Sequence, residues 1–208
     1  MKDLRQNYTK HELLESQAGD NPITLFADWF DNAHKGNVLE PNAMTLSTSA
    51  NDIVNSRTVL LKDVRDDEFV FFTNYNSDKG KQLAINANCT LVFLWLSQER
   101  QVVVRGKAVK VSAEESDEYF YSRPKPSRIG AWASNQSSEI NSREELELQA
   151  SKFEAEFKDK EVPRPPHWGG YAVIPEQIVF WQGRPSRLHD RLLYTKIGKN
   201  WERVRLQP

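Results

Sequence analysis

The 208-residue sequence has a single cysteine, Cys89, so no disulfide bond can form within one chain and no cysteine-based metal cluster can be built. No apolar run approaches the roughly 20 residues of a membrane-spanning helix. The formal net charge is only −1, so no overall positive field favours nucleic acid or an anionic membrane. The N-terminal stretch MKDLRQNYTKHELLES lacks the apolar segment of a secretory signal. These absences predict a cytoplasmic protein that binds neither nucleic acid nor membrane.

Several familiar catalytic motifs are also missing. The sequence has no GxGxxG, no Walker loop, no HExxH and no GxSxG. Its four histidines are too scattered to predict a zinc site, and no metal is expected; they are His11, His34, His167 and His189. A candidate site must therefore be sought among the cationic and hydroxyl side chains.

The pattern of apolar residues predicts one domain of the α+β class. Residues 1–20 are polar and aperiodic and are interpreted as an N-terminal arm, and residues 21–208 as a single domain with a helical annex around 112–160. A helix is predicted over 21–36, capped by Asn21 and ended by Gly36. It is followed by about five strands, then helices, then about four strands. Such clustering, without βαβ alternation, favours an antiparallel barrel.

Two stretches carry cations at strand ends. In SRTVLLK, the odd spacing of Arg57 and Lys62 places them on opposite faces of a regular strand, where they would contact different ligands or parts of one ligand. In FFTNYNSDKGKQL, Thr73, Ser77 and Lys79 lie where a strand leads into a helix N-terminus, a position that favours phosphate. The alternatives are solvated cations and an ordinary helix cap at Ser77.

A third stretch, YFYSRPKPSRIGAW, repeats polar groups every four residues. Tyr119, Arg123 and Ser127 can converge on a phosphate, although Pro124 and Pro126 forbid one continuous helix. The alternative is a basic loop after a helix. Weaker signals come from the neutral donors of NQSS and from a tryptophan in FWQG that is either a wall for a flat ring or a core residue.

The stretch PSRLHDRLLY concentrates charge before an apolar pair. If it forms a strand, Arg187, His189 and Arg191 share one face. This face is either a solvated sheet surface or part of a site for an anionic ligand. We expect Leu188 to pack behind it and Asp190 to brace a neighbouring cation.

Two sets of phosphate donors, a flat aromatic wall and the lack of a nucleophile or metal indicate a protein that holds two phosphorylated planar molecules. The chain resembles the pyridoxamine 5′-phosphate oxidase family over nearly its whole length. The motifs that carry the resemblance are RTVLLK, ERQVVVRGKA, YFYSRP with SRIGAWASNQSS, WGGY, FWQG and RLHDR.

The resemblance implies a split β-barrel homodimer with FMN at the subunit interface. It implies oxidation of pyridoxamine or pyridoxine 5′-phosphate to pyridoxal 5′-phosphate, with O2 as acceptor and H2O2 as product. The implied FMN-binding residues are Arg57, Thr58, Val59, Leu60, Leu61, Lys62, Phe72, Thr73, Lys79, Gln101, Gln136, Ser137, Trp181 and Arg191. The implied substrate-binding residues are Lys62, Tyr119, Arg123, Ser127, Arg187, His189 and, in the arm, Arg5 and Tyr8. Arg187 and His189 are the implied catalytic pair.

One position departs from the family pattern. Where relatives often carry a cation beside the flavin phosphate, this chain has Asp78, which we expect to turn outward and to weaken FMN retention. Three other interpretations stay open from the sequence: a flavin reductase of the same fold that uses NAD(P)H, a non-catalytic carrier of flavin or pyridoxal phosphate, and a plain interaction module.

Overall fold

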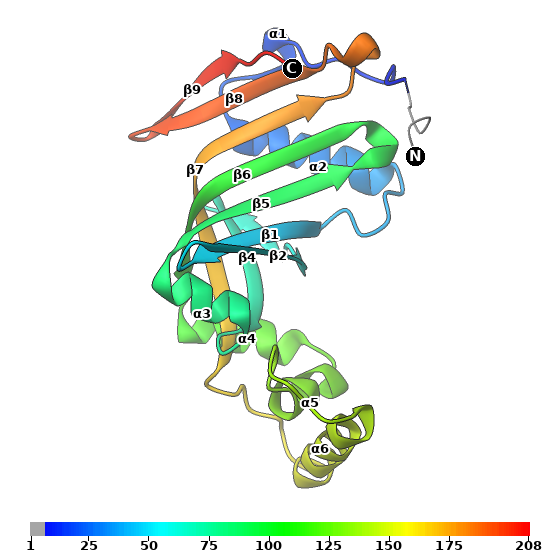
Figure 1. Cartoon of the computed structure of the whole chain (residues 1–208), viewed down its shortest axis with the longest axis vertical. Coiled ribbons are helices and arrows are strands. Elements are labelled where there is room, and N and C mark those ends of the chain that lie inside the picture. The colour runs from blue at the N-terminus through cyan, green and yellow to red at the C-terminus, as the bar shows by residue number, and fades with distance from the viewer. Residues whose placement is uncertain (1–6) are drawn as a thin grey trace.

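The computed structural model describes residues 7–208, which form one long antiparallel sheet with helices packed around it (Figure 1). Arg5 lies outside the described residues. The helices are α1 (Glu15–Ala18), α2 (Pro22–Lys35), α3 (Asp78–Ile85), α4 (Ala113–Ser122), α5 (Lys125–Ala133) and α6 (Arg143–Glu156). The strands are β1 (Ala43–Ala50), β2 (Ile53–Leu60), β3 (Asp63–Arg65), β4 (Glu68–Asn74), β5 (Asn88–Trp95), β6 (Arg100–Lys110), β7 (Trp168–Gln182), β8 (Asp190–Ile197) and β9 (Asn200–Arg205). No helix in this range is long and apolar enough to cross a membrane.

The strand order confirms the predicted antiparallel α+β architecture. The sheet runs β2-β1-β5-β6-β7-β4-β3, and β8 and β9 extend it from the other part of β7. The sheet is not closed: among the described residues β2, β3 and β9 each pair with one neighbouring strand only. The sequence predicts two strands in YAVIP and QIVFWQG, but the structure has the single 15-residue strand β7, which pairs with β4, β6 and β8.

The main core lies between α2 and the sheet. The helix begins as predicted, since the Asn21 side chain accepts a hydrogen bond from the Ile23 N–H, and it ends at Gly36. Phe26 on α2 meets the rings of Phe69 and Phe93 edge-on, with centroids 4.9 and 5.0 Å away. Each such pair contributes about 0.5–1.5 kcal/mol beyond its buried area.

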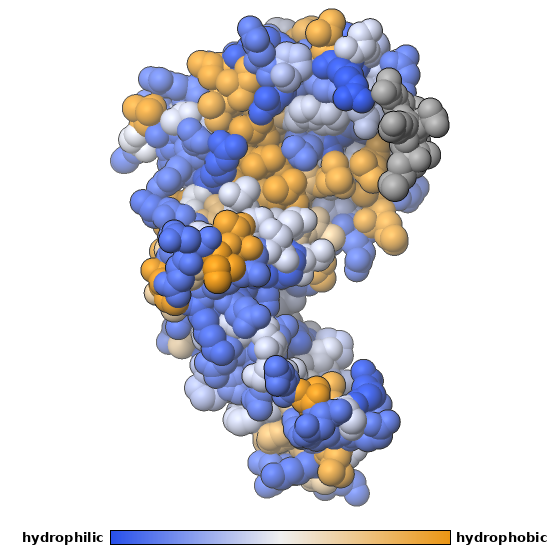
Figure 2. Space-filling view, in the orientation of Figure 1, coloured by the Kyte–Doolittle hydropathy of each residue, from blue (hydrophilic) through white to orange (hydrophobic). Residues whose placement is uncertain are grey.

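The opposite face of the sheet leaves apolar side chains in contact with solvent. Leu94 on β5 and Val109 on β6 are 52% and 43% exposed. Figure 2 shows hydrophobic residues gathered over this part of the sheet. Exposed apolar area of this kind marks a surface where another molecule binds.

The predicted helical annex forms a second, smaller core. The spacing of Ser112 with Glu115 and of Ser142 with Glu145 predicts two helix starts. The two serines do cap α4 and α6, each accepting a hydrogen bond from the N–H three residues later. The cluster is built on Phe120, Ile129, Phe157, Val162 and Trp168. Because Trp168 begins β7, the annex is attached directly to the central strand.

The N-terminal arm packs against β8 and β9. Leu13 is buried and donates its N–H to Asp190 Oδ2 at 3.0 Å, and Arg205 pairs with both Glu15 and Asp190. Tyr194 donates its hydroxyl to the carbonyl of Gly19 at 2.9 Å. These contacts place Tyr8 beside the loop that precedes β8.

The β6–β7 pair contains a register shift that depends on a glycine. The shift falls between Arg105 and Gly106, and a Cβ on Gly106 would lie 2.1 Å from the carbonyl oxygen of Ile174. That contact is with backbone, so one of the two strands would have to move.

We therefore expect Gly106→Ala to lower the free energy of unfolding by about 1–3 kcal/mol, the usual range for overpacking. The matched control is Gly130→Ala inside α5, where a Cβ meets no atom within 4 Å and should gain roughly 0.5–1 kcal/mol. Urea unfolding at equal protein concentrations measures both. Equal midpoints for the two variants would contradict the proposed close contact.

Candidate functional site

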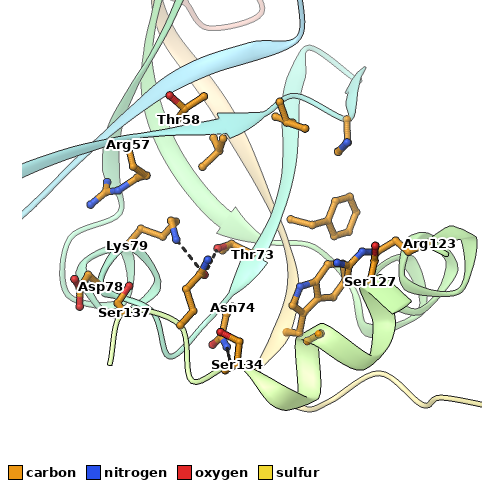
Figure 3. Close-up of a pocket in the computed structure, with 18 of the residues that line it drawn as sticks. Arg57, Thr58, Thr73, Asn74, Asp78, Lys79, Arg123, Ser127, Ser134 and Ser137 are labelled. Atoms are coloured by element: carbon orange, nitrogen blue, oxygen red, sulfur yellow. Dashed lines mark hydrogen bonds between the residues drawn. The ribbon is translucent and has the colours of Figure 1, made fainter. Parts of the chain in front are cut away.

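A cavity of about 1040 Å³ lies between β2, β4, the start of α3 and the α4–α5 segment (Figure 3). The structure brings thirteen of the predicted site residues to its wall. They are Arg57, Thr58, Val59, Leu60, Lys62, Phe72, Thr73, Lys79, Tyr119, Arg123, Ser127, Gln136 and Ser137. Leu61 is not among them; it is 6% exposed and belongs to the main core.

One end of the cavity carries two cations, Arg57 and Lys79. Lys79 is 7% exposed, and its Nζ lies 3.2 Å from both Ser77 Oγ and Gln136 Oε1. Burial, and then the nearby Arg57 guanidinium, lower the pKa of Lys79, while Asp78 opposes the shift. Burial likewise lowers the pKa of Arg57. An anion bound between these two groups would relieve their mutual repulsion.

The local sequence explains how Lys79 reaches the cavity. Ser77 caps α3, since its Oγ accepts the Gly80 N–H at 3.4 Å and donates to the Asn74 carbonyl at 2.7 Å. Gly80 lets this first turn approach β4 closely, because a Cβ there would lie 2.2 Å from the Tyr75 carbonyl oxygen. The interpretation of Ser77 as a cap is correct, and the turn that it caps carries Lys79 inward.

The other end of the cavity carries Arg123, whose guanidinium stacks on an aromatic wall. Its carbon lies 4.6 Å from the centroid of Trp168, which continues a nearly parallel stack through Phe72 and Tyr119. Arg123 Nη1 is buried and has no hydrogen-bond partner in residues 7–208. A buried donor without a partner is costly, so this end is suited to an anionic ligand.

Lys62 and Ser127 lie at the same end as Arg123. The Lys62 ammonium is 5.8 Å from the centroid of Tyr119. Figure 3 shows Arg123 and Ser127 on one side of the cavity and Arg57 and Lys79 on the other. No carboxylate in residues 7–208 forms an ion pair with any of these four cations. The cavity thus has two separate places for an anion.

Asp78 lies at the rim of the cavity end that carries Arg57 and Lys79, where its side chain is exposed. Its charge nevertheless raises the pKa of Arg57 and of Lys79, against the lowering by burial. The carboxylate therefore acts on both cations through space, without a direct ion pair, and partly offsets the positive potential of this end.

A second group of predicted residues lies at the opposite part of β7. Gln101, Trp181 and Arg191 occupy directly paired positions on β6, β7 and β8, so their side chains share one face of the sheet. Leu94 on β5 continues the same row. Together with Tyr8, Gln101 and Trp181 line a small cavity of about 210 Å³.

The loop before β8 does not form the strand that the alternation of Arg187, His189 and Arg191 predicts. Pro185–Arg187 is a 3-10 turn, Ser186 and Arg187 have φ of 56° and 61°, and β8 begins only at Asp190. The prediction that these three side chains share one strand face is therefore wrong, because the turn interrupts the alternation of side chains that a strand would have. Leu188 is 69% exposed and does not pack behind the charged residues.

Asp190 braces neighbouring cations as predicted. Its carboxylate lies 2.8 Å from Arg205 Nη1 and 3.6 Å from Arg184 Nη1. In the same loop the Arg184 N–H donates to His189 Nδ1 at 3.0 Å. An accepting Nδ1 leaves the proton on Nε2, so the ring is neutral and presents Nε2–H as a donor.

Tyr8 and Trp181 enclose the imidazole of His189, with ring centroids at 5.7 and 4.7 Å. Burial, and then the Arg187 guanidinium, lower the pKa of His189, while Asp190 opposes the shift. The surroundings of the ring therefore favour the same neutral state as its hydrogen bond.

Three residues that contact the two arginines of the main cavity escape prediction from the sequence. Trp168 stacks on Arg123, whereas Thr48 and Gln82 accept hydrogen bonds from Arg57, and Thr48 donates to Gln82. The WGGY motif contains Trp168 but gives no sign of its stacking partner. Thr48 and Gln82 carry no signal, because their roles come from strand pairing and helix packing.

Comparisons with known proteins agree with one family. Residues 30–156 match the family model described as pyridoxamine 5′-phosphate oxidase. Residues 168–208 match the model described as pyridoxine 5′-phosphate oxidase C-terminal dimerisation region. Proteins named pyridoxine/pyridoxamine 5′-phosphate oxidase are similar along the whole chain. The one from Trichormus variabilis is 54% identical, covering 99% of this chain and 97% of its own, and the one from Rubrobacter xylanophilus is 50% identical, covering 99% and 95%.

Two solved structures share the fold. PhzG from Burkholderia lata, in complex with tetrahydrophenazine-1-carboxylic acid, is 30% identical with a TM-score of 0.89, covering 96% of this chain and all of its own. A pyridoxamine 5′-phosphate oxidase-related, FMN binding protein from Nostoc punctiforme has a TM-score of 0.69 at 14% identity, covering 89% and 96%.

The environment of His189 predicts its titration. We expect the ring to be the neutral Nε2–H tautomer at pH 7 and to titrate below the ordinary value of about 6.5. Nitrogen NMR shifts identify the tautomer, and the pH series gives the midpoint. Arg187→Ala should raise the midpoint, because it removes a repulsive cation. Arg191→Ala is the control, since that guanidinium points to the Gln207 carbonyl at 3.1 Å. A proton on Nδ1 would contradict the assignment.

Proposed function

The chain belongs to the pyridoxamine 5′-phosphate oxidase family, and on that premise we propose that it oxidises pyridoxamine 5′-phosphate or pyridoxine 5′-phosphate to pyridoxal 5′-phosphate, with FMN as its cofactor. The observation that carries the proposal is one cavity with two separate cationic ends, Arg57 with Lys79 and Arg123 with Lys62, none of them paired with a carboxylate in the described residues. Two phosphorylated molecules require two such places.

The residues at the α3 end fit the phosphate of FMN. Lys79 is almost completely buried, and within residues 7–208 its ammonium is hydrogen-bonded only to neutral oxygens, those of Ser77 and Gln136. A buried ammonium without a counter-ion is unfavourable, and a phosphate would supply the missing charge. Arg57 and Lys79 would hold that phosphate, and Thr73, Gln136 and Ser137 would add neutral contacts.

The Arg123 end fits the substrate phosphate. Its unpartnered Nη1 and the stacking on Trp168 hold a guanidinium ready for a bidentate contact. Lys62, Tyr119 and Ser127 would complete the grip. A phosphate grip of this kind favours a phosphorylated substrate over the nicotinamide donor of a flavin reductase.

The remaining predicted residues belong to a different part of the chain. Trp168 and Trp181 stand thirteen positions apart on β7, or roughly 40 Å measured along a strand. A single copy therefore does not bring Arg187 and His189 to the main cavity. The dimerisation region matched by residues 168–208 contains both residues, and the protein is a homodimer. In our proposal the second copy places Arg187, His189, Trp181 and Arg191 against the cavity of the first.

The apolar face of the sheet supports this assembly. Leu94 is 52% exposed and lies in the cross-strand row of Gln101, Trp181 and Arg191. A second copy seated here would cover the apolar side chain and bring the polar members of the row to the subunit interface.

In this proposal the protein promotes the oxidation mainly by holding the substrate and FMN in fixed positions. FMN, when bound, supplies the two-electron acceptor, with O2 as the final acceptor and H2O2 as product. The amine substrate also consumes one water and releases ammonia. The protein anchors both phosphates, which holds the 4′ carbon of the substrate in place. Arg187 would restrain the substrate ring, and the Nε2–H of His189 would donate to a polar substituent. Neither residue is assigned as an obligatory base.

We also propose that the enzyme works in the cytoplasm. The proposal is supported by the single cysteine, Cys89, which is a buried free thiol, so the chain has no disulfide bond that would need an oxidising compartment.

The proposal predicts a yellow protein that forms peroxide when pyridoxamine 5′-phosphate is added. Arg57→Ala should weaken FMN binding about 10- to 100-fold, the range for losing a charged hydrogen bond.

Arg187→Ala should instead lower turnover of the FMN-saturated enzyme, with FMN affinity changed less than threefold. Fluorescence titration of FMN and a coupled peroxide assay separate the two effects. Full turnover in Arg187→Ala would contradict its role, and a protein that binds no FMN would contradict the proposed function.

Asp78 generates a further prediction. Asp78→Asn should tighten FMN binding about two- to fivefold at low salt, within the range of exposed charge interactions. The gain in affinity should shrink as salt is added, because ions in solution screen the repulsion between the exposed Asp78 carboxylate and the phosphate. Asp66→Asn, in the β3–β4 turn outside the cavity lining, is the control for removal of one negative charge. An unchanged or weaker affinity for Asp78→Asn would show that this carboxylate does not oppose the phosphate.

A further inference from the structure

We propose that Thr48 and Gln82 are positioning residues for the cofactor phosphate: they bind one edge of the Arg57 guanidinium and leave the other edge free for the phosphate. The proposal deepens the FMN part of the proposed function and rests on it. Neither residue is among the candidate site residues that the sequence indicates, although Gln82 lies in the stretch FFTNYNSDKGKQL, and neither lines the main cavity.

The contacts form a closed triangle. Arg57 Nη1 donates to Thr48 Oγ1 at 2.7 Å, and Arg57 Nη2 donates to Gln82 Oε1 at 3.3 Å. Thr48 Oγ1 donates to the same Gln82 oxygen at 2.5 Å. A threonine hydroxyl has a single proton, so donating it to Gln82 leaves an oxygen lone pair directed at Arg57. Each member therefore fixes the orientation of the other two.

The fold explains why these three side chains meet. Leu46 on β1 is paired with Arg57 on β2, and Thr48 is paired with Asn55. Thr48 is thus a diagonal neighbour of Arg57 on the same face of the hairpin. Gln82 follows Lys79 by three residues on α3, so both lie on one side of the helix. The helix that supplies the second cation of the site also supplies the amide that holds the first.

A count of donors shows what remains for a ligand. A guanidinium has five N–H groups. The two on Nη1 are taken by Thr48 and by the carbonyls of Leu46 and Asn55, and one on Nη2 is taken by Gln82. Within residues 7–208, Nε makes no hydrogen bond. Nε–H and the second Nη2–H are adjacent and form the fork that binds two oxygens of a phosphate.

Burial makes the triangle rigid. Thr48 is 2% exposed, so water does not replace a lost partner there. An arginine at the edge of a sheet would otherwise sample many rotamers, and ordering it on binding would cost free energy. The triangle removes that cost before the phosphate arrives.

The test uses full-length apoprotein and two ligands, FMN and riboflavin, which lacks the phosphate. Thr48→Val and Gln82→Leu should each weaken FMN binding about 5- to 20-fold, while riboflavin affinity changes less than twofold. Thr48→Ser keeps the hydroxyl and should restore FMN binding to within about threefold of the original. Fluorescence titration gives all these values, and thermal melting checks that each variant is folded.

A double-mutant comparison separates positioning from general damage. In an Arg57→Ala background, Thr48→Val and Gln82→Leu should have no further effect on FMN binding, because their only route to the phosphate is through Arg57. If Thr48→Val fails to fold, the FMN affinity of Gln82→Leu, whose substitution lies on a partly exposed helix face, tests the proposal alone. Unchanged FMN affinity in Gln82→Leu, or equal losses with and without Arg57, would overturn the proposal. Failure of the unmodified protein to bind FMN would instead overturn the proposed function.

Discussion

The backbone pairing of β7 is the constraint on which the rest of the structure depends. Its first six residues pair with β4, residues Tyr171–Gln182 pair with β6, and its last six residues pair with β8. This one strand thus joins three neighbours into a continuous sheet. One end of the strand supplies Trp168 to the main cavity, while the other carries Trp181 in the row beside the C-terminal loop. The distance between the two parts of the site is set by the length of one strand.

In the proposed function, that separation means that each copy of the homodimer supplies a part of the site that the cavity of the other copy lacks. The cavity of one copy has both phosphate places but lacks the Arg187–His189 pair, which lies on the dimerisation region. The N-terminal arm adds to this pair, because Tyr8 packs against both Trp181 and His189. In the proposed dimer, this surface would both join the two copies and complete the site.

Electrostatics within the cavity depends on burial more than on net charge. Lys79 and Arg123 are held in apolar or neutral surroundings, and burial is the largest cause of the lowered pKa of each. The protein as a whole is nearly neutral. Positive potential is concentrated inside the cavity, where its four cations form no ion pair with a carboxylate of the described residues. The exposed carboxylate of Asp78 at the rim lowers this potential near Arg57 and Lys79. Two phosphates can therefore be recognised without a basic surface that would attract nucleic acid.

The sequence by itself determined the elements and the inventory of the site. Capping at Asn21, Ser112 and Ser142, alternating strands and the phosphate-type side chains near Arg57, Lys79 and Arg123 are local patterns, and local patterns are readable because they depend on neighbours in the chain. Only the tertiary structure decided the rest. It made one strand of residues 168–182, turned Arg187 out of the expected strand, and brought Thr48 and Gln82 to Arg57. These features arise from contacts between distant segments, and no spacing in the sequence encodes them.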